Sequence, residues 1–269
     1  MGLPRDDSWK AGDLYEPYVG RWSRRVADRF LAWLGLPAGL DWIDVGCGTG
    51  ALTEAIVETT APASVRGFDP SAGFLAYAKA RVVHPNIRFD VADARSLPLA
   101  GRCADASVAG LVLNFVPDPA AAVVEMSRVT RRDGTVASYV WDYADRMELM
   151  RQFWDAAVEL DPDAEALDEG RRFPICRPEP LTTLFEGAGL AEVDLTPIDV
   201  ETRFRDFDEY WSPFLGGQGP APAYVAALSE ERRAELRERL RARLPVRSDG
   251  AIHLVARAWA VRGTRRDAD

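Results

Sequence analysis

The stretch DWIDVGCGTGAL, residues 41–52, decides the fold. A short apolar run leads into three glycines at every second position, and a run of helical composition follows them. Glycine permits a positive φ and lets the backbone approach a ligand closely. A helix that begins there offers free N–H groups and the positive end of its dipole. The stretch therefore predicts a strand, a ligand-binding turn and a helix.

The same alternation of strand and helix continues along the chain. Five short strand candidates and two longer ones near the C-terminus lie at residues 41–45, 64–69, 86–93, 103–115, 134–142, 191–204 and 251–263. Strands that alternate with helices form βαβ units. We therefore expect an α/β fold, a doubly wound, mostly parallel seven-stranded sheet with an antiparallel C-terminal edge strand and a helical cap.

Four parts follow from this pattern. We expect an N-terminal helical cover over residues 1–39, a ligand-binding core over 40–203, a helical cap insertion over 204–250, and a final strand and tail over 251–269. The simplest arrangement lets the last two strands close the sheet edge while the helices between them form the cap.

Composition and charge narrow the classes of partner. The chain has 269 residues, of which 47% are hydrophobic and 28% charged, and its net charge is -9. A basic footprint for nucleic acid or for a membrane surface is therefore not expected. The sequence shows no apolar run of membrane-spanning length and no signal peptide, so we expect a cytoplasmic protein, monomeric or homodimeric.

Cysteine and histidine are scarce. The three cysteines are far apart and have neither metal nor redox spacing, and only two histidines are present. We therefore expect no metal site. Cys47, between the glycines, is interpreted as a small buried filler.

Asp44 precedes the glycines at the end of the first strand. A carboxylate there repels a pyrophosphate but can accept hydrogen bonds from an ammonium group. This favours a ligand that carries an amino acid. A dinucleotide remains an alternative, because Gly46, Gly48 and Ala51 satisfy G-x-G-x-x-G/A and Asp69 lies about 20 residues on. A plain strand-to-helix turn is the third interpretation.

Asp69 ends the second strand candidate in GFDPS. A carboxylate at that point can accept hydrogen bonds from both hydroxyls of a ribose. Pro70 offers an apolar face for an adenine ring. The alternative is an aspartate helix cap before a proline at the first helical position, and both roles can coexist.

Polar residues also end the next two strand candidates. Asp93 can accept from an exocyclic amine while the Ala94 N–H faces a ring nitrogen, although a plain loop aspartate is an alternative. Asn114 follows in LVLNFVPDP, with Phe115 and Val116 available to line a pocket. Polar residues at four successive strand ends indicate one crevice beyond the sheet.

These motifs carry a resemblance to a known family. The chain resembles the class I S-adenosylmethionine-dependent methyltransferases, in the small-molecule group that includes the quinone-biosynthesis C-methyltransferases. The resemblance rests on DWIDVGCGTGAL, GFDPS, DVADARSLPLAGRCADASVAGLVLNFVPDP, VTRRDGTVASYVWD and LTTLFEGAGLAEVDL. It covers residues 40–142 closely and 175–262 loosely, and it implies a Rossmann-like core.

The resemblance also assigns cofactor-binding roles. Gly46, Gly48 and Gly50 would pack against the methionyl part of S-adenosylmethionine, with Asp44 near its ammonium group. Asp69 would bind the ribose hydroxyls. These roles agree with the interpretation of the residues themselves.

The resemblance implies that residues at the later strand ends and in the N-terminal segment bind the rest of the cofactor. Asp93 and Ala94 would hold adenine, and Asn114 would flank the sulfonium. The segment YEPYVGRWS resembles a cover over the cofactor, with Tyr18 and Arg21 as candidates and Arg21 able to pair with the cofactor carboxylate. A surface-packed helix is the alternative for this segment.

The acceptor is expected to be a small molecule. The chain has NFVPDP where base-modifying members carry an N-P-P-Y-type motif, and it has no basic face. Trp141, Tyr210, Trp211 and Phe214 are the predicted acceptor pocket, with an ordinary core contact as the alternative for the cap aromatics.

No catalytic residue is predicted. A base is needed only for some acceptors, and Asp142, Tyr143, Tyr210 and His253 are the conceivable ones. Two other functions are possible. One is a nicotinamide-dependent oxidoreductase, which the scarcity of lysine makes less favourable. The other is a non-catalytic S-adenosylmethionine-binding protein in which the cap blocks the acceptor cavity.

Overall fold

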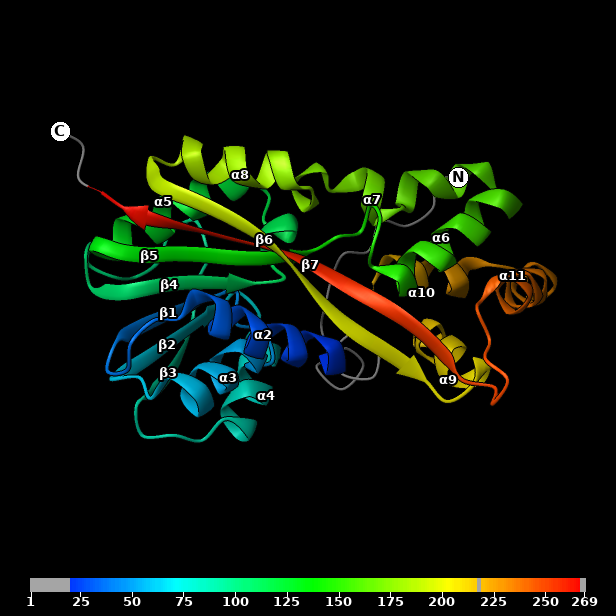
Figure 1. Ribbon diagram of the computed structural model, residues 1–269, viewed down its shortest axis with the longest axis horizontal. Helices are drawn as coiled ribbons and strands as arrows, with labels where there is room; N and C mark the ends of the chain where they lie inside the picture. Colours follow the sequence, from blue (N-terminus) through cyan, green and yellow to red (C-terminus); the bar gives the residue numbers. More distant parts are fainter. Residues whose placement is uncertain (1–19, 217–218, 267–269) are drawn as a thin grey trace.

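A seven-stranded sheet forms the centre of the molecule in the computed structural model, which describes residues 20–216 and 219–266 (Figure 1). The strand order is β3-β2-β1-β4-β5-β7-β6. The strands are β1 (Asp41–Val45), β2 (Ser64–Asp69), β3 (Ile87–Val91), β4 (Ala104–Gly110), β5 (Thr130–Trp141), β6 (Leu190–Phe204) and β7 (Ile252–Arg265).

The first five strands are parallel to one another. β1 pairs with β2 and β4, β2 with β3, and β4 with β5, all in parallel. Four of the five residues of β1 are buried, as expected of a strand that helices cover on both faces. The predicted doubly wound, mostly parallel sheet is confirmed. Parallel pairing brings the carboxyl ends of β1 to β5 to one edge of the sheet.

The antiparallel strand is β7, the last in the chain, as predicted. It pairs antiparallel with β5 on one side and with β6 on the other, so it lies one place inside the edge. β6 and β7 have 15 and 14 residues, and in Figure 1 they extend beyond β4 and β5 toward a group of helices at one end of the molecule.

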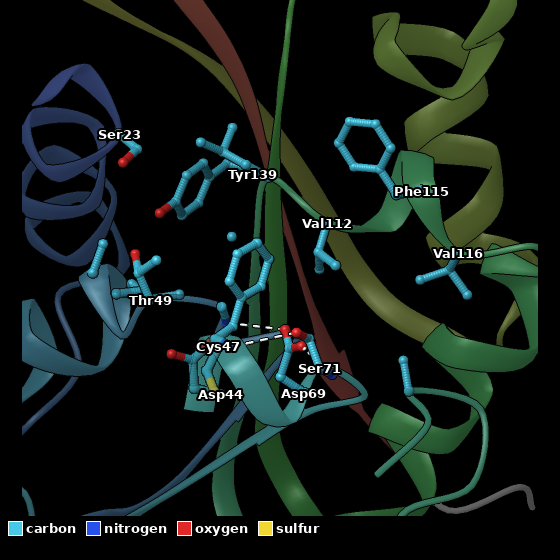
Figure 2. Close-up of a pocket in the computed structure, with 18 of the residues that line it drawn as sticks. Ser23, Asp44, Cys47, Thr49, Asp69, Ser71, Val112, Phe115, Val116 and Tyr139 are labelled. Atoms are coloured by element: carbon cyan, nitrogen blue, oxygen red, sulfur yellow. Dashed lines mark hydrogen bonds between the residues drawn. The ribbon is translucent and has the colours of Figure 1, made fainter. Parts of the chain in front are cut away.

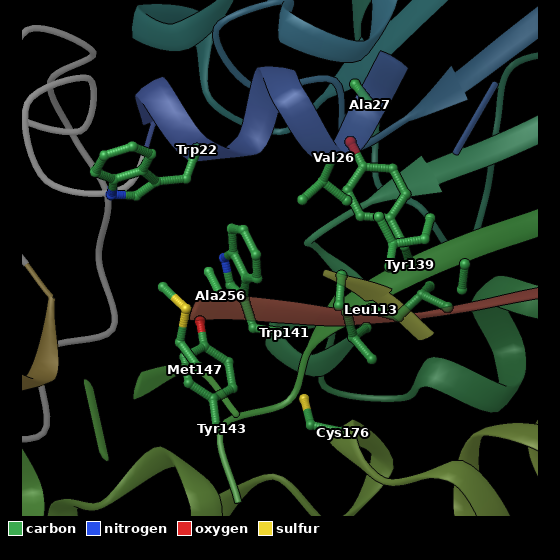
Figure 3. Packing of buried hydrophobic residues seen from close by; sticks show 14 of the residues in the cluster. Trp22, Val26, Ala27, Leu113, Tyr139, Trp141, Tyr143, Met147, Cys176 and Ala256 are labelled. Atoms are coloured by element: carbon green, nitrogen blue, oxygen red, sulfur yellow. The ribbon is translucent and has the colours of Figure 1, made fainter. Parts of the chain in front are cut away.

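Helices cover both faces of the sheet. α2 (Arg21–Leu34), α3 (Ala51–Thr60) and α4 (Ala72–Arg81) lie on one face, and α5 (Pro119–Val129) and α8 (Pro178–Gly187) on the other (Figure 1). α2 has an apolar stripe that includes Trp22, Val26 and Ala27, and Figure 3 shows Val26 beside Tyr139. This packing places the start of α2 over the carboxyl ends of the central strands.

The end of the molecule beyond β6 and β7 is helical. It contains α6 (Glu148–Leu160), α7 (Glu169–Arg172), α9 (Phe207–Trp211), α10 (Pro220–Ala227) and α11 (Glu230–Arg243), together with the 3₁₀ turns η3 (Pro162–Leu167), η4 (Pro174–Cys176) and η5 (Ser212–Leu215). α10 and α11 pack against α6, and α10 also packs against η3. The helices of the predicted cap over 204–250 therefore pack against α6 and η3, which lie within the predicted core over 40–203.

β4 is shorter than the predicted strand at 103–115. It ends at Gly110, and Leu111, with φ +59°, turns the chain out of the sheet. A short 3₁₀ helix, η2 (Leu113–Phe115), follows.

Candidate active site

A cavity of about 310 Å³ lies at the carboxyl ends of the parallel strands, within the size range of small-molecule sites. Figure 2 shows Asp44, Cys47 and Asp69 at one side of it and Phe115 and Val116 across from them. The lining residues are Ser23, Asp44, Gly46, Cys47, Gly48, Thr49, Ala51, Leu52, Asp69, Pro70, Ser71, Phe74, Asp93, Ala94, Gly110, Leu111, Val112, Phe115, Val116, Pro117, Tyr139, Trp141, Tyr143, Met150 and Glu169.

The glycine turn forms one wall. Gly46, Gly48 and Gly50 have φ values of +70°, +52° and +85°, which L side chains rarely adopt. A Cβ on Gly46 would lie 2.4 Å from a methyl group of Val112, so this turn approaches the chain after β4 closely. Cys47 is buried beside it, as expected of a small filler, and burial raises the pKa of its thiol.

Asp69 ties the turn to the second strand. Its Oδ2 accepts from Gly48 N at 3.0 Å and its Oδ1 from Ser71 N at 2.8 Å. The side chain is 6% exposed, and burial raises its pKa. Asp69 is not the helix cap, because α4 begins at Ala72 and Ser71 accepts from Phe74 N. The carboxylate thus faces the cavity with both oxygens held in place by backbone donors.

Asp44 is wholly buried on β1 and also lines the cavity. Its Oδ2 accepts from Thr53 Oγ1 at 2.6 Å, whereas nothing in residues 20–216 and 219–266 hydrogen-bonds to its Oδ1. Burial, together with the charge of Asp69, raises the pKa of Asp44 to about 7. A buried carboxyl oxygen without a partner is costly, so this atom marks a place where a ligand donor fits.

Asp93, Ala94 and Pro70 line the cavity as well. The Asp93 carboxylate is half-exposed, and Arg95 donates to both of its oxygens, at 2.9 Å from Nε and 2.6 Å from Nη2. These hydrogen bonds lower the pKa of Asp93 to about 2. The carboxylate is therefore ionised and its orientation is fixed.

Asn114 and Arg21 lie elsewhere. Asn114 is buried in η2 and is absent from the lining, and its Nδ2 has no partner among the described residues. The positive φ of Leu111 turns this segment so that Phe115, and not Asn114, reaches the cavity.

Arg21 pairs with Glu209 at 2.7 Å, and its guanidinium lies 4.2 Å from the centroid of the Trp22 ring. Tyr18 lies outside the described residues.

Of the four residues predicted for the acceptor pocket, only Trp141 lines the cavity. The Tyr210 hydroxyl donates to Leu149 O at 3.0 Å, and the Phe214 ring stacks on Phe153 with centroids 4.5 Å apart. Trp211 packs beside Phe214. These three cap aromatics form the core between the cap and α6, which is the alternative that the sequence left open.

Sequence reasoning missed Glu169. This residue begins α7, is 3% exposed and lines the cavity. Trp154 Nε1 on α6 donates to its Oε2, and burial raises its pKa to about 8. Long-range contacts hold this four-residue helix in place, and no sequence motif marks it, so the sequence contains no signal that predicts Glu169.

Of the conceivable bases, Tyr143 lines the cavity, whereas Asp142, Tyr210 and His253 do not.

The charge of the lining is one-sided. Four carboxyl side chains line the cavity, those of Asp44, Asp69, Asp93 and Glu169, and among the described lining residues none is Lys, Arg or His. Within the described ranges no group of three or more potential ligand side chains could hold a metal ion. The site therefore suits a ligand that carries positive charge and several hydrogen-bond donors.

A family model described as a methyltransferase domain matches residues 43–138, which run from β1 through most of β5. This part of the chain is similar to a methyltransferase domain. The matched range contains the glycine turn and the acids at the ends of β1, β2 and β3. The matched range leaves out four residues that also line the cavity: Trp141, Tyr143, Met150 and Glu169.

Curated relatives that are themselves methyltransferases match part of this chain. It is 38% identical over 96 residues to a malonyl-[acyl-carrier protein] O-methyltransferase from Hahella chejuensis, which is 35% of this chain and 34% of the relative. It is 30% identical over 118 residues to a ubiquinone/menaquinone biosynthesis C-methyltransferase from Campylobacter jejuni, which is 42% of this chain and 49% of the relative. The match thus spans about a third to a half of each relative's length.

A solved structure resembles nearly the whole chain. Phosphoethanolamine N-methyltransferase 2 from Haemonchus contortus, in complex with phosphomonomethylethanolamine and S-adenosylhomocysteine, superimposes with a TM-score of 0.59 at 14% identity. The superposition covers 95% of this chain and 57% of that one. At this identity the likeness shows the fold and nothing about the acceptor. Among the described helices of this chain, none has the length and hydropathy that crossing a membrane requires.

Proposed function

We propose that this chain transfers the methyl group of S-adenosylmethionine to a small-molecule acceptor bound at the opposite side of the same cavity. The observation that carries the proposal is Asp44 Oδ1, a fully buried carboxyl oxygen without a partner among the described residues, beside the glycine turn. An ammonium group of the cofactor would supply the missing donor and favour the ionised form of the carboxyl.

The neighbouring residues fit the rest of the cofactor. Asp69 has both oxygens oriented by backbone N–H groups and can accept from two ribose hydroxyls. The cofactor carboxylate would meet free backbone N–H groups at the start of α3. Asp93, Ala94 and Pro70 lie together on the lining, where adenine would bind. The ammonium, the carboxylate, the ribose and the adenine of the cofactor therefore each have a matching group.

A nicotinamide dinucleotide fits this cavity poorly. Its pyrophosphate is anionic, and the glycine turn on which it would lie stands next to Asp44 and Asp69, whose charges already disfavour one another. The described lining residues offer no cation to offset the repulsion. S-adenosylmethionine, which carries a sulfonium and an ammonium, benefits from the same acids.

Among the described residues of the cap, none lines the cavity. Tyr210, Trp211 and Phe214 pack into the core, so they do not block the space beside Trp141, Tyr143 and Met150. A cavity that continues past the cofactor site favours catalysis over mere cofactor binding. The walls on this side are mostly apolar, which fits an apolar acceptor.

The cofactor supplies an activated methyl group, and the protein supplies position and a water-poor surrounding. Holding an acceptor atom about 3–3.5 Å from the methyl carbon, in line with the sulfur, can contribute roughly 7–11 kcal/mol to lowering the barrier. In this chain the turn at Gly46–Gly50 and Asp69 fix the cofactor, while Trp141, Tyr143 and Met150 confine the acceptor.

The test is methyl transfer itself. The purified protein, given S-adenosylmethionine labelled in its methyl group and an extract of small metabolites, should form at least one labelled product seen by mass spectrometry. Asp69→Ala should abolish that product, and Asp90→Ala, a change of an exposed acid on β3, should leave it unchanged. Labelled product that persists undiminished in Asp69→Ala would refute the proposal.

A further inference from the structure

The acceptor side of the cavity contains one carboxyl group that the family match does not reach, that of Glu169. Tyr143 lies near Glu169, because Arg151 Nη1 donates both to Tyr143 O and to Asp168 Oδ1, and Phe115, Trp141 and Met150 also line the cavity. Glu169 is 3% exposed, so it is a carboxyl in an apolar surrounding that opens onto the cavity. Such a group costs stability unless a ligand or a neighbour compensates it.

Neighbouring contacts fix the position of Glu169. Asp168, the residue before it, accepts from Arg151 Nη1 at 3.0 Å and Nη2 at 2.7 Å, and its Oδ1 also accepts from Gly170 N at 2.8 Å. Arg151 Nη1 donates in addition to Tyr143 O at 3.0 Å. Arg151 therefore ties α6, α7 and the segment after β5 together around the acceptor side.

The Glu169 side chain is held as well. Trp154 Nε1 donates to its Oε2, which anchors one oxygen of the carboxyl. The aromatic ring of Trp154 is itself fully buried. A side chain with so little freedom is suited to recognise one group of a ligand in one position.

We propose that the acceptor side binds an apolar molecule bearing a single amine, and that Glu169 is the counter-ion of its ammonium group. This inference rests on the proposed methyl transfer and names the class of acceptor. Glu169 is here a specificity-determining residue, not a catalytic one.

Two observations and one general principle favour an amine over an alcohol or an acid. The described lining has four carboxyl groups and no cationic side chain, so no charged group there would stabilise an anionic acceptor. A buried carboxyl gains more from a full opposite charge than from a neutral donor. Burial also raises the pKa of Glu169 to about 8, and this desolvation cost is what an ammonium group would offset.

The experiment compares ligands that differ only in the charge of one group. Phenyl, indolyl and naphthyl rings, each carrying an ethylamine, an ethanol or a propionate side chain, are titrated into the full chain saturated with S-adenosylhomocysteine, with calorimetry as the readout. We expect at least one of the amines to bind, the matching alcohol to bind at least tenfold more weakly, and the matching acid not to bind.

The key variant is Glu169→Gln, which keeps an oxygen for Trp154 Nε1 and loses the charge. It should weaken amine binding at least tenfold, leave alcohol binding within about twofold, and leave the affinity for S-adenosylhomocysteine unchanged. Glu165→Gln removes a nearby exposed carboxylate that pairs with Arg171 and should change none of these values. A merely structural role for Glu169 would weaken amine and alcohol alike.

The outcomes separate the two proposals. Failure of S-adenosylhomocysteine to bind contradicts the proposed function. Three results would overturn the amine inference alone. S-adenosylhomocysteine could bind while no amine does, an acid could bind as tightly as its amine, or Glu169→Gln could leave amine binding unchanged. Should Glu169→Gln fail to fold, the ranking of amine, alcohol and acid on the unaltered chain still decides.

Discussion

Asp41 and Asp44 lie three residues apart on β1 and have opposite surroundings. Asp41, at the amino end, accepts from Ser64 Oγ at 2.7 Å and from Arg131 Nη2 at 3.0 Å, and these hydrogen bonds lower its pKa. Asp44, near the carboxyl end, has one oxygen without a partner among the described residues, and burial raises its pKa to about 7.

Acidic side chains have different roles at the two ends of this sheet. At the amino end, Arg131 bridges Asp41 and Asp105, which joins β1, β4 and β5. At the carboxyl end, Asp44 and Asp69 stand close enough to disfavour each other's charge. Paired acids stabilise the fold, whereas a buried acid without a pair marks the place of a ligand.

The largest effect is expected at Asp69. In the proposed site, Asp69→Ala would remove two charge-assisted hydrogen bonds to the ribose, each worth about 1.5–3 kcal/mol, so affinity for S-adenosylhomocysteine should fall roughly 1000-fold. Calorimetric titration measures this fall, with Asp90→Ala as the exposed control on β3. A loss of less than tenfold would mean that Asp69 is not the ribose ligand.

The second effect concerns the glycine turn. A Cβ at Gly46 would lie 2.4 Å from Val112, and the φ of +70° adds strain, so Gly46→Ala should lower the free energy of unfolding by about 3 kcal/mol. Gly39 also has a positive φ, +80°, but nothing lies within 4 Å of its Cβ position. Gly39→Ala should therefore cost only about 1 kcal/mol in urea unfolding, and equal costs would argue against a tight turn.

The third effect is a pH dependence of the protein without ligand. The pKa values of Asp44 and Glu169 are raised in the folded state to about 7 and about 8, so the folded form holds protons that the unfolded form releases. Their stabilisation is complete below about pH 4 and is lost as the pH rises through 7 and 8.

Asp44 alone should lower the free energy of unfolding by roughly 2–3 kcal/mol between pH 5 and pH 8, at 1.36 kcal/mol per pKa unit. Denaturant unfolding at the two pH values measures this, and Asp44→Asn should remove most of its share. An unchanged slope in Asp44→Asn would show that its surroundings do not raise its pKa.

The smallest effect is expected at the amino end of β1. The Asp41 side chain is partly exposed, and pairs of this kind contribute at most about 1 kcal/mol. Asp41→Asn should lower the free energy of unfolding by no more than that, and affinity for S-adenosylhomocysteine should not change. If Asp41→Asn instead weakened binding as Asp44→Asn does, the contrast between the two ends of β1 would be lost.

Most of the fold could be predicted from the sequence because its signals are local. Apolar runs and helix caps predict β1 and β2 with the bounds that the structure shows. Parallel pairing of the strands then predicts that Asp44, Asp69 and Asp93 lie at one cavity, and all three line it. Their binding roles stay predictions.

The remaining parts depend on tertiary contacts. Asn114 leaves the predicted position because Leu111 adopts a positive φ that no composition rule demands of leucine. The spacing of Tyr210 and Phe214 suits a pocket wall and a core contact alike. Only tertiary contacts decide between them: Phe214 stacks on Phe153, and Tyr210 packs against Phe214. Glu169 belongs to a helix of four residues, whose position follows from the ion pair between Arg151 and Asp168.

The most direct measurement is a calorimetric titration of the unaltered chain with S-adenosylhomocysteine and, separately, with NADH, at pH 6 and pH 8. S-adenosylhomocysteine should bind with one-to-one stoichiometry, and more tightly at pH 8 because its ammonium pairs with ionised Asp44, whereas NADH should give no binding heat. Absence of S-adenosylhomocysteine binding at both pH values, or tighter binding of NADH, would contradict the claim that the unpaired acids at the carboxyl ends of the strands form a methyltransferase cofactor site.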